Sequence, residues 1–220
     1  MPKLVDHDAR RTEIAQATWA VVRDVGIERL RLRDIADEVG FTTGVFAHYF
    51  RDKDSVLRFA FNLAYQHTYE RILNSNETVS SGLQCLRNAL VALIPNRKRP
   101  ESVAFVAMCF GIRHSSDPLL AADYKKNRNE YARLLKSYVD DATSEGEILF
   151  DESSNNVLDL IFAVLDGVCI AALLNPEGYS NTRATRIVDT MIEQLSSDGE
   201  QTLAVKNASP QRKSAKGTIQ

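Results

Sequence analysis

Apolar residues recur at helical spacing along nearly the whole chain, and no stretch alternates apolar and polar residues as a half-buried strand does. This periodicity predicts an all-α protein of about nine helices. The first helix is expected at 8–25, where Gly26 ends it. Its single apolar stripe consists of Ile14, Thr18, Val21, Val22 and Val25.

Turn-forming residues delimit the remaining helices. Asn74, Ser75 and Asn76 are expected to end one long helix, while prolines and glycines separate those that follow. Apolar content falls in 197–220, where Lys and Arg are scattered among Ser, Gly and Gln, and this composition predicts a disordered tail. The helices are expected at 32–39, 43–49, 53–73, 79–94, 101–114, 117–145, 153–174 and 180–196.

Residues that usually carry catalysis or bind metals are few and scattered. The 220 residues include three cysteines without a CxxC pair and four separated histidines. This spacing argues against a zinc site and favours reduced thiols in a cytosolic protein. The sequence also lacks GxSxG, HExxH and a glycine-rich phosphate loop. We therefore expect no catalytic residue, no metal and no cofactor.

Two segments bear on where the protein is found. Residues 1–11 are charged where an export signal needs an apolar run, so we expect a cytoplasmic protein. Residues 157–174 are apolar enough to resemble a membrane span, but they contain Asp159 and Asp166. Each carboxylate costs about 2.5–3.5 kcal/mol at a bilayer centre. We therefore expect a buried helix and no membrane partner.

The net charge of −2 hides an uneven distribution of charge. Residues 1–60 carry as many basic as acidic side chains, so bulk charge does not predict nucleic-acid binding. However, no acidic residue lies between Val39 and Arg51, although acids flank this window, and such a local absence suits a surface that faces DNA. The densest basic cluster outside the tail lies between two prolines, which predicts a solvated loop, and consists of Arg97, Lys98 and Arg99.

Residues 30–50 fit a helix-turn-helix. The apolar seam between its two short helices can be formed by Ile35, Val39, Phe46 and Tyr49. Ala36 is small where the helices would cross. Gly40 falls where the first helix must end in a left-handed conformation, which costs a residue with a Cβ about 1 kcal/mol. Thr42 then lies at the N-cap of the second helix, where its side-chain oxygen can accept an otherwise unpaired backbone N–H.

The segment RDIADEVGFTTGVFAHYFRDKDSVL at 33–57 resembles the signature of the tetracycline-repressor (TetR) family of transcriptional regulators. The shared features are an Ile-Ala step, a glycine turn, a recognition helix led by Thr or Ser, an aromatic residue before Phe, and a Lys that opens the fourth helix. The resemblance extends upstream to Ile14, Ala17 and Gly26. It implies a DNA-binding domain at 1–52 and a helical effector-binding and dimerisation domain at 53–196.

The resemblance also implies roles for individual residues. In such a motif the second helix enters the major groove while its neighbours hold the phosphates. Thr42, Thr43 and Gly44 would form the leading edge of this recognition helix, and the small Gly44 would allow close approach to DNA. Lys53 would meet a phosphate with help from the N-terminus of the following helix. The further contacts implied are those of Arg33, His48 and Tyr49.

Two positions depart from the family pattern. Ala47 stands where the family usually has a Tyr that contacts phosphate, so this contact must shift to His48 or Tyr49 or be lost. Arg31 stands where Thr or Ser usually caps the first helix of the motif, so that helix start lacks an obvious cap, although Arg31 could add a phosphate contact. By packing alone, Tyr49 could equally belong to the core, and His48 and Lys53 could be solvated surface side chains.

The 157–174 helix carries two apolar stripes and must bury both. One stripe is expected to pack on the core of its own chain, through Leu158, Ile161, Leu165, Val168 and Ala172. The other is small at Gly167 and Ala171, which suits close contact with a second subunit. The family resemblance likewise implies a homodimer, formed through a four-helix bundle of the last two helices. The dimer contacts expected are Leu160, Val164, Gly167, Ala171, Ile187 and Met191.

The segments PNRKRPE, RHSSDPLLAADY and AVLDGVCIAALLNPEGYS resemble the regulatory half of choline-responsive BetI-type regulators. This implies a small-molecule effector whose identity does not follow. Three tyrosines at seven-residue spacing could wall an apolar pocket or a cage for a cation, or could be ordinary core: Tyr124, Tyr131 and Tyr138. Asp166 needs a partner in its apolar helix, and Arg113 or His114 could supply it. The effector-pocket residues expected are Phe105, Met108, Tyr124, Tyr131 and Asp166.

The leading hypothesis is a repressor that binds a palindromic, double-stranded DNA operator as a homodimer and is released by a small-molecule effector. A helical protein-interaction or ligand-binding module without specific DNA binding would explain the amphipathic stripes but not the turn chemistry at Gly40 and Thr42. An enzyme finds no supporting motif.

Overall fold

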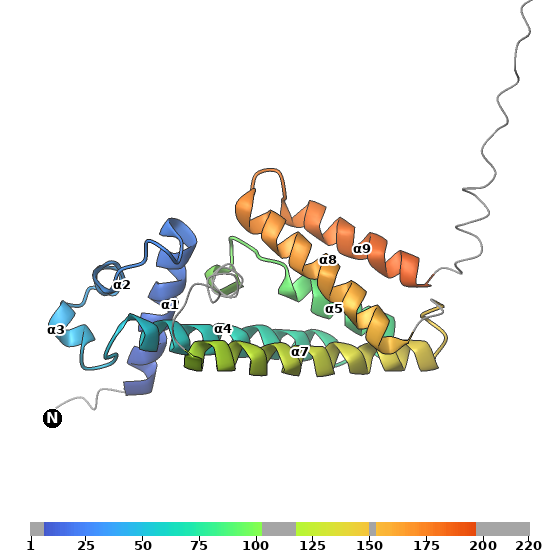
Figure 1. Ribbon diagram of the computed structural model, residues 1–220, viewed down its shortest axis with the longest axis horizontal. Coiled ribbons are helices and arrows are strands. Elements are labelled where there is room, and N and C mark those ends of the chain that lie inside the picture. Colours follow the sequence, from blue (N-terminus) through green and yellow to red (C-terminus); the bar gives the residue numbers. More distant parts are fainter. Residues whose placement is uncertain (1–6, 103–117, 150–152, 197–220) are drawn as a thin grey trace, which may run out of the picture.

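The computed structural model describes residues 7–102, 118–149 and 153–196, and within them it contains helices and loops but no strand (Figure 1). The all-α expectation is confirmed. The tail and all but the start of the helix expected at 101–114 lie outside the described residues. The helices are α1 (His7–Val25), α2 (Leu32–Glu38), α3 (Thr43–Phe46), α4 (Lys53–Asn76), α5 (Gly82–Leu93), α7 (Pro118–Ser144), α8 (Ser154–Leu174) and α9 (Asn181–Ser196).

Three local expectations need correction. α3 ends at Phe46 rather than at Tyr49, because the next residues form turns. α4 continues beyond 73 to its end at Asn76, because the Nδ2 of Asn76 donates a hydrogen bond to the carbonyl of Cys85 at 3.0 Å and so fastens the end of α4 to α5. Val25 does not join the buried stripe of α1, since it lies in the last turn and is 42% exposed.

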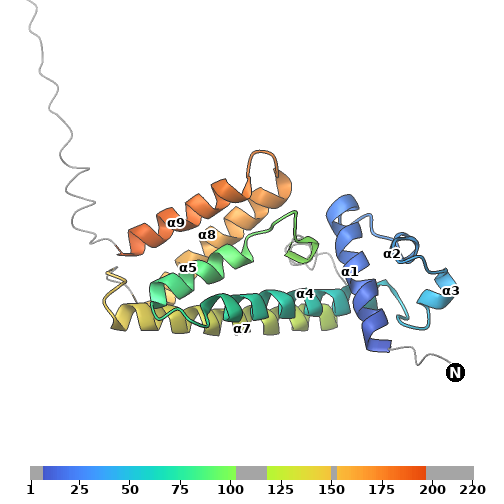
Figure 2. The same ribbon diagram turned by 180° about the vertical axis from the view of Figure 1, so that it is seen from behind.

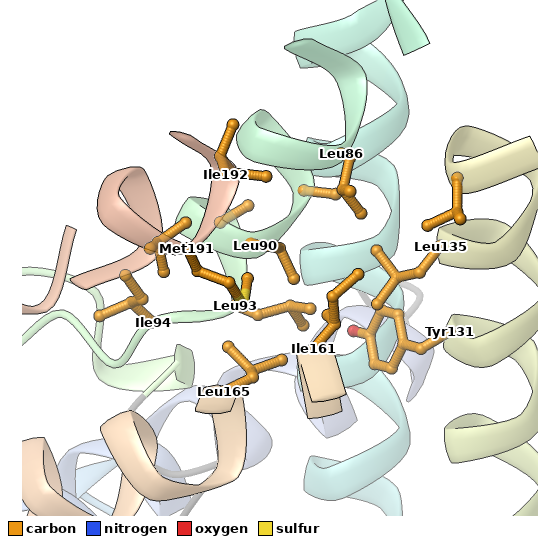
Figure 3. Close-up of a cluster of buried hydrophobic side chains, with 14 of the residues drawn as sticks. Leu86, Leu90, Leu93, Ile94, Tyr131, Leu135, Ile161, Leu165, Met191 and Ile192 are labelled. Carbon is orange, nitrogen blue, oxygen red and sulfur yellow. The ribbon is translucent and has the colours of Figure 1, made fainter. Parts of the chain in front are cut away.

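The buried side chains form two hydrophobic cores that share α4. The N-terminal core lies among α1, α2, α3, the first half of α4 and the start of α7, which contributes Leu120, and it includes Ile14, Trp19, Phe46, Phe50 and Phe61. The C-terminal core lies among α5, α7, α8, α9 and the second half of α4, which contributes Tyr65 and Ile72. Figure 3 shows its centre, where Leu90, Leu135 and Ile161 meet. The two units are therefore joined by a helix whose two halves are buried in different cores.

α4 and α7 lie side by side in both views of the molecule (Figures 1 and 2), and a polar network joins them where the two cores meet. Arg58 Nε donates to Asp123 Oδ2 at 2.6 Å, and Asn62 Nδ2 donates to the same oxygen at 2.8 Å. Asn127 Nδ2 donates to Asn62 Oδ1 at 3.2 Å. Burial alone would raise the pKa of Asp123, but the hydrogen bonds from Arg58 and Asn62 outweigh it and lower this pKa.

Loss of the Asp123 charge should destabilise the fold. Asp123→Asn is expected to lower the free energy of unfolding at pH 7 by roughly 1–2 kcal/mol, because it removes a charge-assisted hydrogen bond from a partly buried site. Since folding lowers the pKa of Asp123, its contribution is complete above its unfolded pKa of about 3.9 and disappears as the pH falls through the folded value. Urea unfolding at pH 7 and at pH 3 measures both effects.

The matched control is Asp140→Asn, which breaks an exposed ion pair with Lys136 on the same helix. Its effect should be smaller, as is usual for surface pairs. An Asp123→Asn variant as stable as the wild type at pH 7 would contradict the role of this network.

Candidate nucleic-acid interface

The turn between α2 and α3 is built around Gly40. Its φ of +69° is left-handed, as the sequence predicted. The N–H of Gly40 donates to the carbonyl of Asp37 at 3.1 Å, and the N–H of Phe41 donates to the carbonyl of Ala36 at 2.8 Å. This pair of bonds is the Schellman motif, which satisfies the last carbonyls of a helix and reverses the chain. The turn therefore sets the angle at which α3 leaves α2.

α3 begins at a side-chain cap and presents an open edge. Thr42 Oγ1 accepts a hydrogen bond from the N–H of Val45 at 3.3 Å, which confirms the expected N-cap. A Cβ added to Gly44 would have a single neighbour within 4 Å, Thr42 Oγ1 at 3.9 Å. Among the described residues, nothing else fills the space in front of Gly44. A helix of four residues is not stable by itself, so the conformation and position of α3 depend on the burial of Phe46.

The apolar seam holds the two short helices against each other. Ile35, Ala36 and Phe46 are buried, as expected, while Val39 and Tyr49 are half-buried. The Tyr49 ring stacks on Phe41 with centroids 6.0 Å apart, and it lies 5.2 Å from the ring of His7. The ring of Tyr49 is therefore engaged in packing against Phe41 and His7. His48, its neighbour, is exposed.

The two arginines expected to contact phosphate are both exposed at the start of α2. Arg33 Nε lies 3.5 Å from Asp37 Oδ2 in an exposed ion pair. As expected, the side chain of Arg31 forms no cap hydrogen bond at this helix start. Asp34 Oδ2 accepts a hydrogen bond from the backbone N–H of Arg31 at 3.1 Å, which is the bond that the third helical residue makes in a capping box.

Lys53 occupies a less open position than expected. It is half-buried, and its Nζ donates to the carbonyl of Ile27 at 3.4 Å. The N-terminus of α4 is already capped, because Asp52 Oδ1 accepts a hydrogen bond from the N–H of Ser55 at 2.8 Å. The hydrogen bond from the Ser55 backbone, followed by one from Arg51, lowers the pKa of Asp52. This carboxylate offsets the help that the helix N-terminus was expected to give Lys53.

Two residues that sequence reasoning missed lie on the same surface. Val45 is exposed on α3, although its neighbour Phe46 is buried. Arg51 follows α3, and its side chain is 91% exposed and paired with Asp52 at 2.9 Å. Helical spacing from Thr42 could have found Val45, since residues three apart share a face. The side chain of Thr43 is not described, although its backbone begins α3.

Of the expected effector-pocket residues, the structure describes Tyr124, Tyr131 and Asp166, and it places them in different surroundings. Tyr131 is 4% exposed in the C-terminal core, and its ring contacts those of Tyr65 and Tyr69 at centroid distances of 4.9 and 6.0 Å. Tyr124 packs instead on the N-terminal core, so the two tyrosines do not share a pocket wall. Tyr65 also donates a hydrogen bond to Glu130, and burial raises the pKa of its phenol. Phe105 and Met108 lie outside the described residues.

Asp166 has a partner that the sequence did not indicate. Both carboxylate oxygens of Asp166 accept hydrogen bonds from Arg128, at 3.0 and 2.9 Å, and the Arg128 guanidinium lies 3.8 Å from the centroid of the Phe162 ring. Arg128 comes from α7, which packs on α8. Arg113 and His114, the partners that were expected, lie outside the described residues. The side chain of Asp166 is 47% exposed, so its ion pair with Arg128 lies at the surface rather than in a pocket.

The outer face of α8 differs from the expected stripe. Val164 and Ala171 are half-buried, and Val164 packs on the C-terminal core. On α9, Met191 was wrongly expected at a dimer interface, because its side chain is buried in that core (Figure 3), and Ile187 packs against the same core. The apolar and small residues of α8 that are exposed fall at spacings of three and four: Leu160, Ala163, Gly167, Ile170 and Leu174.

A helix-turn-helix at one end of an all-helical body defines a DNA-binding transcriptional regulator. The chain belongs to the tetR family of bacterial regulatory proteins, whose model matches residues 14–59, and the model of the BetI-type transcriptional repressor C-terminal domain matches residues 84–197. The resemblance found in the sequence is therefore confirmed.

Similar proteins agree with this assignment. The HTH-type transcriptional regulator PksA of Bacillus subtilis (strain 168) is 27% identical over 201 residues, which cover 89% of this chain and 94% of that protein. BetI of Escherichia coli (strain K12) is 26% identical over 198 residues, 88% and 97% of the two chains. A putative TetR-family regulator from Rhodococcus sp. has a TM-score of 0.74 at 19% identity and 86% and 100% coverage. A putative regulator from Saccharomonospora viridis, solved in complex with choline, has a TM-score of 0.74 at 18% identity and 84% and 96% coverage.

The two glycines of the motif should respond oppositely to alanine. Gly40→Ala is expected to lower the free energy of unfolding by about 1 kcal/mol, because φ is left-handed there. Gly44→Ala should raise it by up to about 1 kcal/mol, because Gly44 lies in a helix with open space beside it. Denaturant unfolding of the two variants tests the pair, and a change of the same sign in both would contradict the geometry of the turn.

Proposed function

We propose that the protein is a homodimeric repressor that binds a palindromic operator through α3 and leaves it when a small molecule binds the C-terminal domain. The observation that carries this proposal is the open edge of α3. Thr42 caps the start of this helix, and the buried side chain of Phe46 anchors it on the N-terminal core. No acidic residue lies between Val39 and Arg51, so this edge can approach phosphates without repulsion. Because a regulator of this kind acts on DNA inside the cell, we assign the protein to the cytoplasm.

The exposed positions suggest how contacts are divided. Gly44 and Val45 would face base edges, since α3 is the helix expected in the major groove, and the family resemblance implies the same role for Thr43. Arg31, Arg33, Arg51 and the half-buried Lys53 would hold phosphates, and exposed ion pairs such as Arg33 with Asp37 are given up at little cost. Thr42 caps the helix beside them.

Between the two candidates for the contact that Ala47 cannot make, we assign it to His48. His48 is exposed, whereas the ring of Tyr49 is stacked on Phe41. His48 can therefore donate a hydrogen bond to DNA without disturbing the packing of the motif.

The outer face of α8 supports a dimer. Leu160, Ala163, Gly167 and Ile170 follow the a and d positions of a heptad, and Gly167 leaves room for close approach. Of the described helices, α8 alone is long and apolar enough to cross a membrane. We assign its exposed stripe to the same stripe of a second subunit, which gives two recognition helices related by a two-fold axis and hence a palindromic operator.

A single phosphate contact can be tested through salt dependence. Lys53→Ala should reduce the magnitude of the negative slope of log K against log salt concentration by about 1, because one phosphate contact fewer releases one counterion fewer on binding. It should weaken binding to all DNA sequences alike. The operator can be selected from a random duplex pool, and fluorescence anisotropy at several salt concentrations gives the slope. Thr43→Ala should instead change the ranking of operator sequences and leave the slope unchanged.

An unchanged slope for Lys53→Ala would assign Lys53 to its hydrogen bond with Ile27 rather than to DNA. Failure of the wild-type protein to select any sequence would favour a helical interaction module instead of a repressor.

The dimer face can be tested at Ile170, which is 38% exposed. Ile170→Glu should convert the dimer to monomers at micromolar concentration, because it places a like charge in both halves of a self-complementary stripe. Sedimentation velocity measures the mass. The control, Leu73→Glu, changes a comparably exposed leucine on α4 and should remain dimeric. A dimeric Ile170→Glu variant would show that subunits meet elsewhere.

A further inference from the structure

A cavity of about 730 Å³ lies between the DNA-binding end of the molecule and the C-terminal domain. One wall comes from the end of α1 and the turn that follows it, within 22–29. The other walls come from residues 95–98, which follow α5, and from residues within 172–181 at the end of α8 and the turn to α9. Figures 1 and 2 show the end of α1 facing this turn. We call this the interdomain cavity, and it is separate from the Tyr65, Tyr69 and Tyr131 cluster.

The lining of the interdomain cavity is amphipathic. Val25 and Leu174, which are 42% and 78% exposed, are among its apolar residues. Single exposed apolar side chains are common, but these two line the same cavity, where one ligand could cover both. Its volume falls within the usual range of about 300–1,000 Å³ for small-molecule sites.

The charged groups of the cavity are mostly cationic. Among the described residues, four basic side chains line it, against a single carboxylate, Glu28: Arg23, Arg29, Arg97 and Lys98. Arg23 is already neutralised by Asp24, to which it donates two hydrogen bonds at 2.7 and 2.9 Å. Arg97 and Lys98 are both exposed, and after the hydrogen bond from Arg23, the charge of Arg97 also contributes to the lowered pKa of Asp24. The cavity therefore combines an apolar floor with an excess of positive charge.

We propose that the interdomain cavity binds an amphipathic anion, namely a carboxylate with a medium-length hydrocarbon body. The body would cover Val25 and Leu174, and the carboxylate would accept hydrogen bonds from Arg97 and Lys98. A cation of the same shape would meet like charges at the same place. Nothing in this step depends on DNA binding.

Such a ligand would also act on DNA binding, and this part rests on the proposed function. It would contact α1, which belongs to the N-terminal core, together with α8, which belongs to the C-terminal core. Its affinity therefore depends on how the two domains are placed. If the ligand changes the affinity for operator by a certain factor, bound operator must change the affinity for the ligand by the same factor, because coupling between two binding sites is reciprocal.

Binding is tested with decanoate by titration calorimetry on the full chain, with decyltrimethylammonium as the cation of equal length. The wild type should bind decanoate saturably and the cation at least about tenfold more weakly. Arg97→Glu/Lys98→Glu should weaken decanoate about tenfold or more, since both anchoring charges are reversed. The control is Lys125→Glu/Lys126→Glu, an adjacent exposed pair on α7 that does not line the cavity, and it should bind decanoate within about twofold of the wild type.

A second variant guards against misfolding of the first. Val25→Asp places a carboxylate in the apolar part of the cavity at an exposed position, and it should also weaken decanoate about tenfold. Circular dichroism checks that each variant keeps its helices. The proposal is overturned if the wild type shows no saturable decanoate binding, if the cation binds as tightly, or if the Arg97→Glu/Lys98→Glu variant binds like the wild type.

Coupling is tested by measuring operator affinity with and without saturating decanoate, and decanoate affinity with and without operator. The two factors should be equal and different from one, and Arg97→Glu/Lys98→Glu should abolish the decanoate effect on operator affinity. Factors of one would overturn the regulatory role. A protein that binds decanoate but selects no operator refutes the repressor and leaves the cavity proposal standing, whereas operator binding without decanoate binding refutes the cavity alone.

Discussion

The structure depends on the burial of α4 in two cores at once. Its first half contributes Phe61 to the N-terminal core, and its second half contributes Ile72 to the C-terminal core. Neither core can shift its share of this helix without moving the other, because close-packed interiors transmit small displacements rather than absorb them. The polar network of Arg58, Asn62 and Asp123 lies beside the first half of α4 and ties it to α7. A change in the C-terminal helices can therefore reach the helix-turn-helix through α4, which runs without a break from one core to the other.

The helix-turn-helix is stable only in this setting. Four residues of α3 form too few internal hydrogen bonds to hold a helix, so the N-terminal core supplies the stability through Phe46 and Phe50. The Schellman motif at Gly40 and the cap at Thr42 then fix the direction of α3. Because its stability comes from packing behind it, the outer edge of α3 is left free for polar and small residues.

Features governed by neighbouring residues could be predicted from the sequence, while those set by packing across the fold could not. The stop at Gly40 and the cap at Thr42 were predicted because backbone geometry and local hydrogen bonds decide them. The partner of Asp166 was missed because Arg128 is brought to it by the packing of α7 on α8. Met191 was assigned to the dimer interface because an apolar stripe shows that a helix face is buried. The stripe does not show whether that face packs on the core of its own chain or on a second subunit. The interdomain cavity could not be foreseen, since its three walls are distant in sequence.

The position of α8 connects these separate surfaces. One face of the helix packs Ile161 and Leu165 into the C-terminal core, and the opposite stripe from Leu160 to Ile170 is the proposed dimer face. Its last residue, Leu174, lines the interdomain cavity opposite the end of α1. A ligand in that cavity would therefore bear on α8 at the point where the dimer face ends and the DNA-binding domain begins. In the proposed homodimer the operator would fix the spacing of two recognition helices, so a shift of α1 relative to α8 would alter that spacing in both subunits at once.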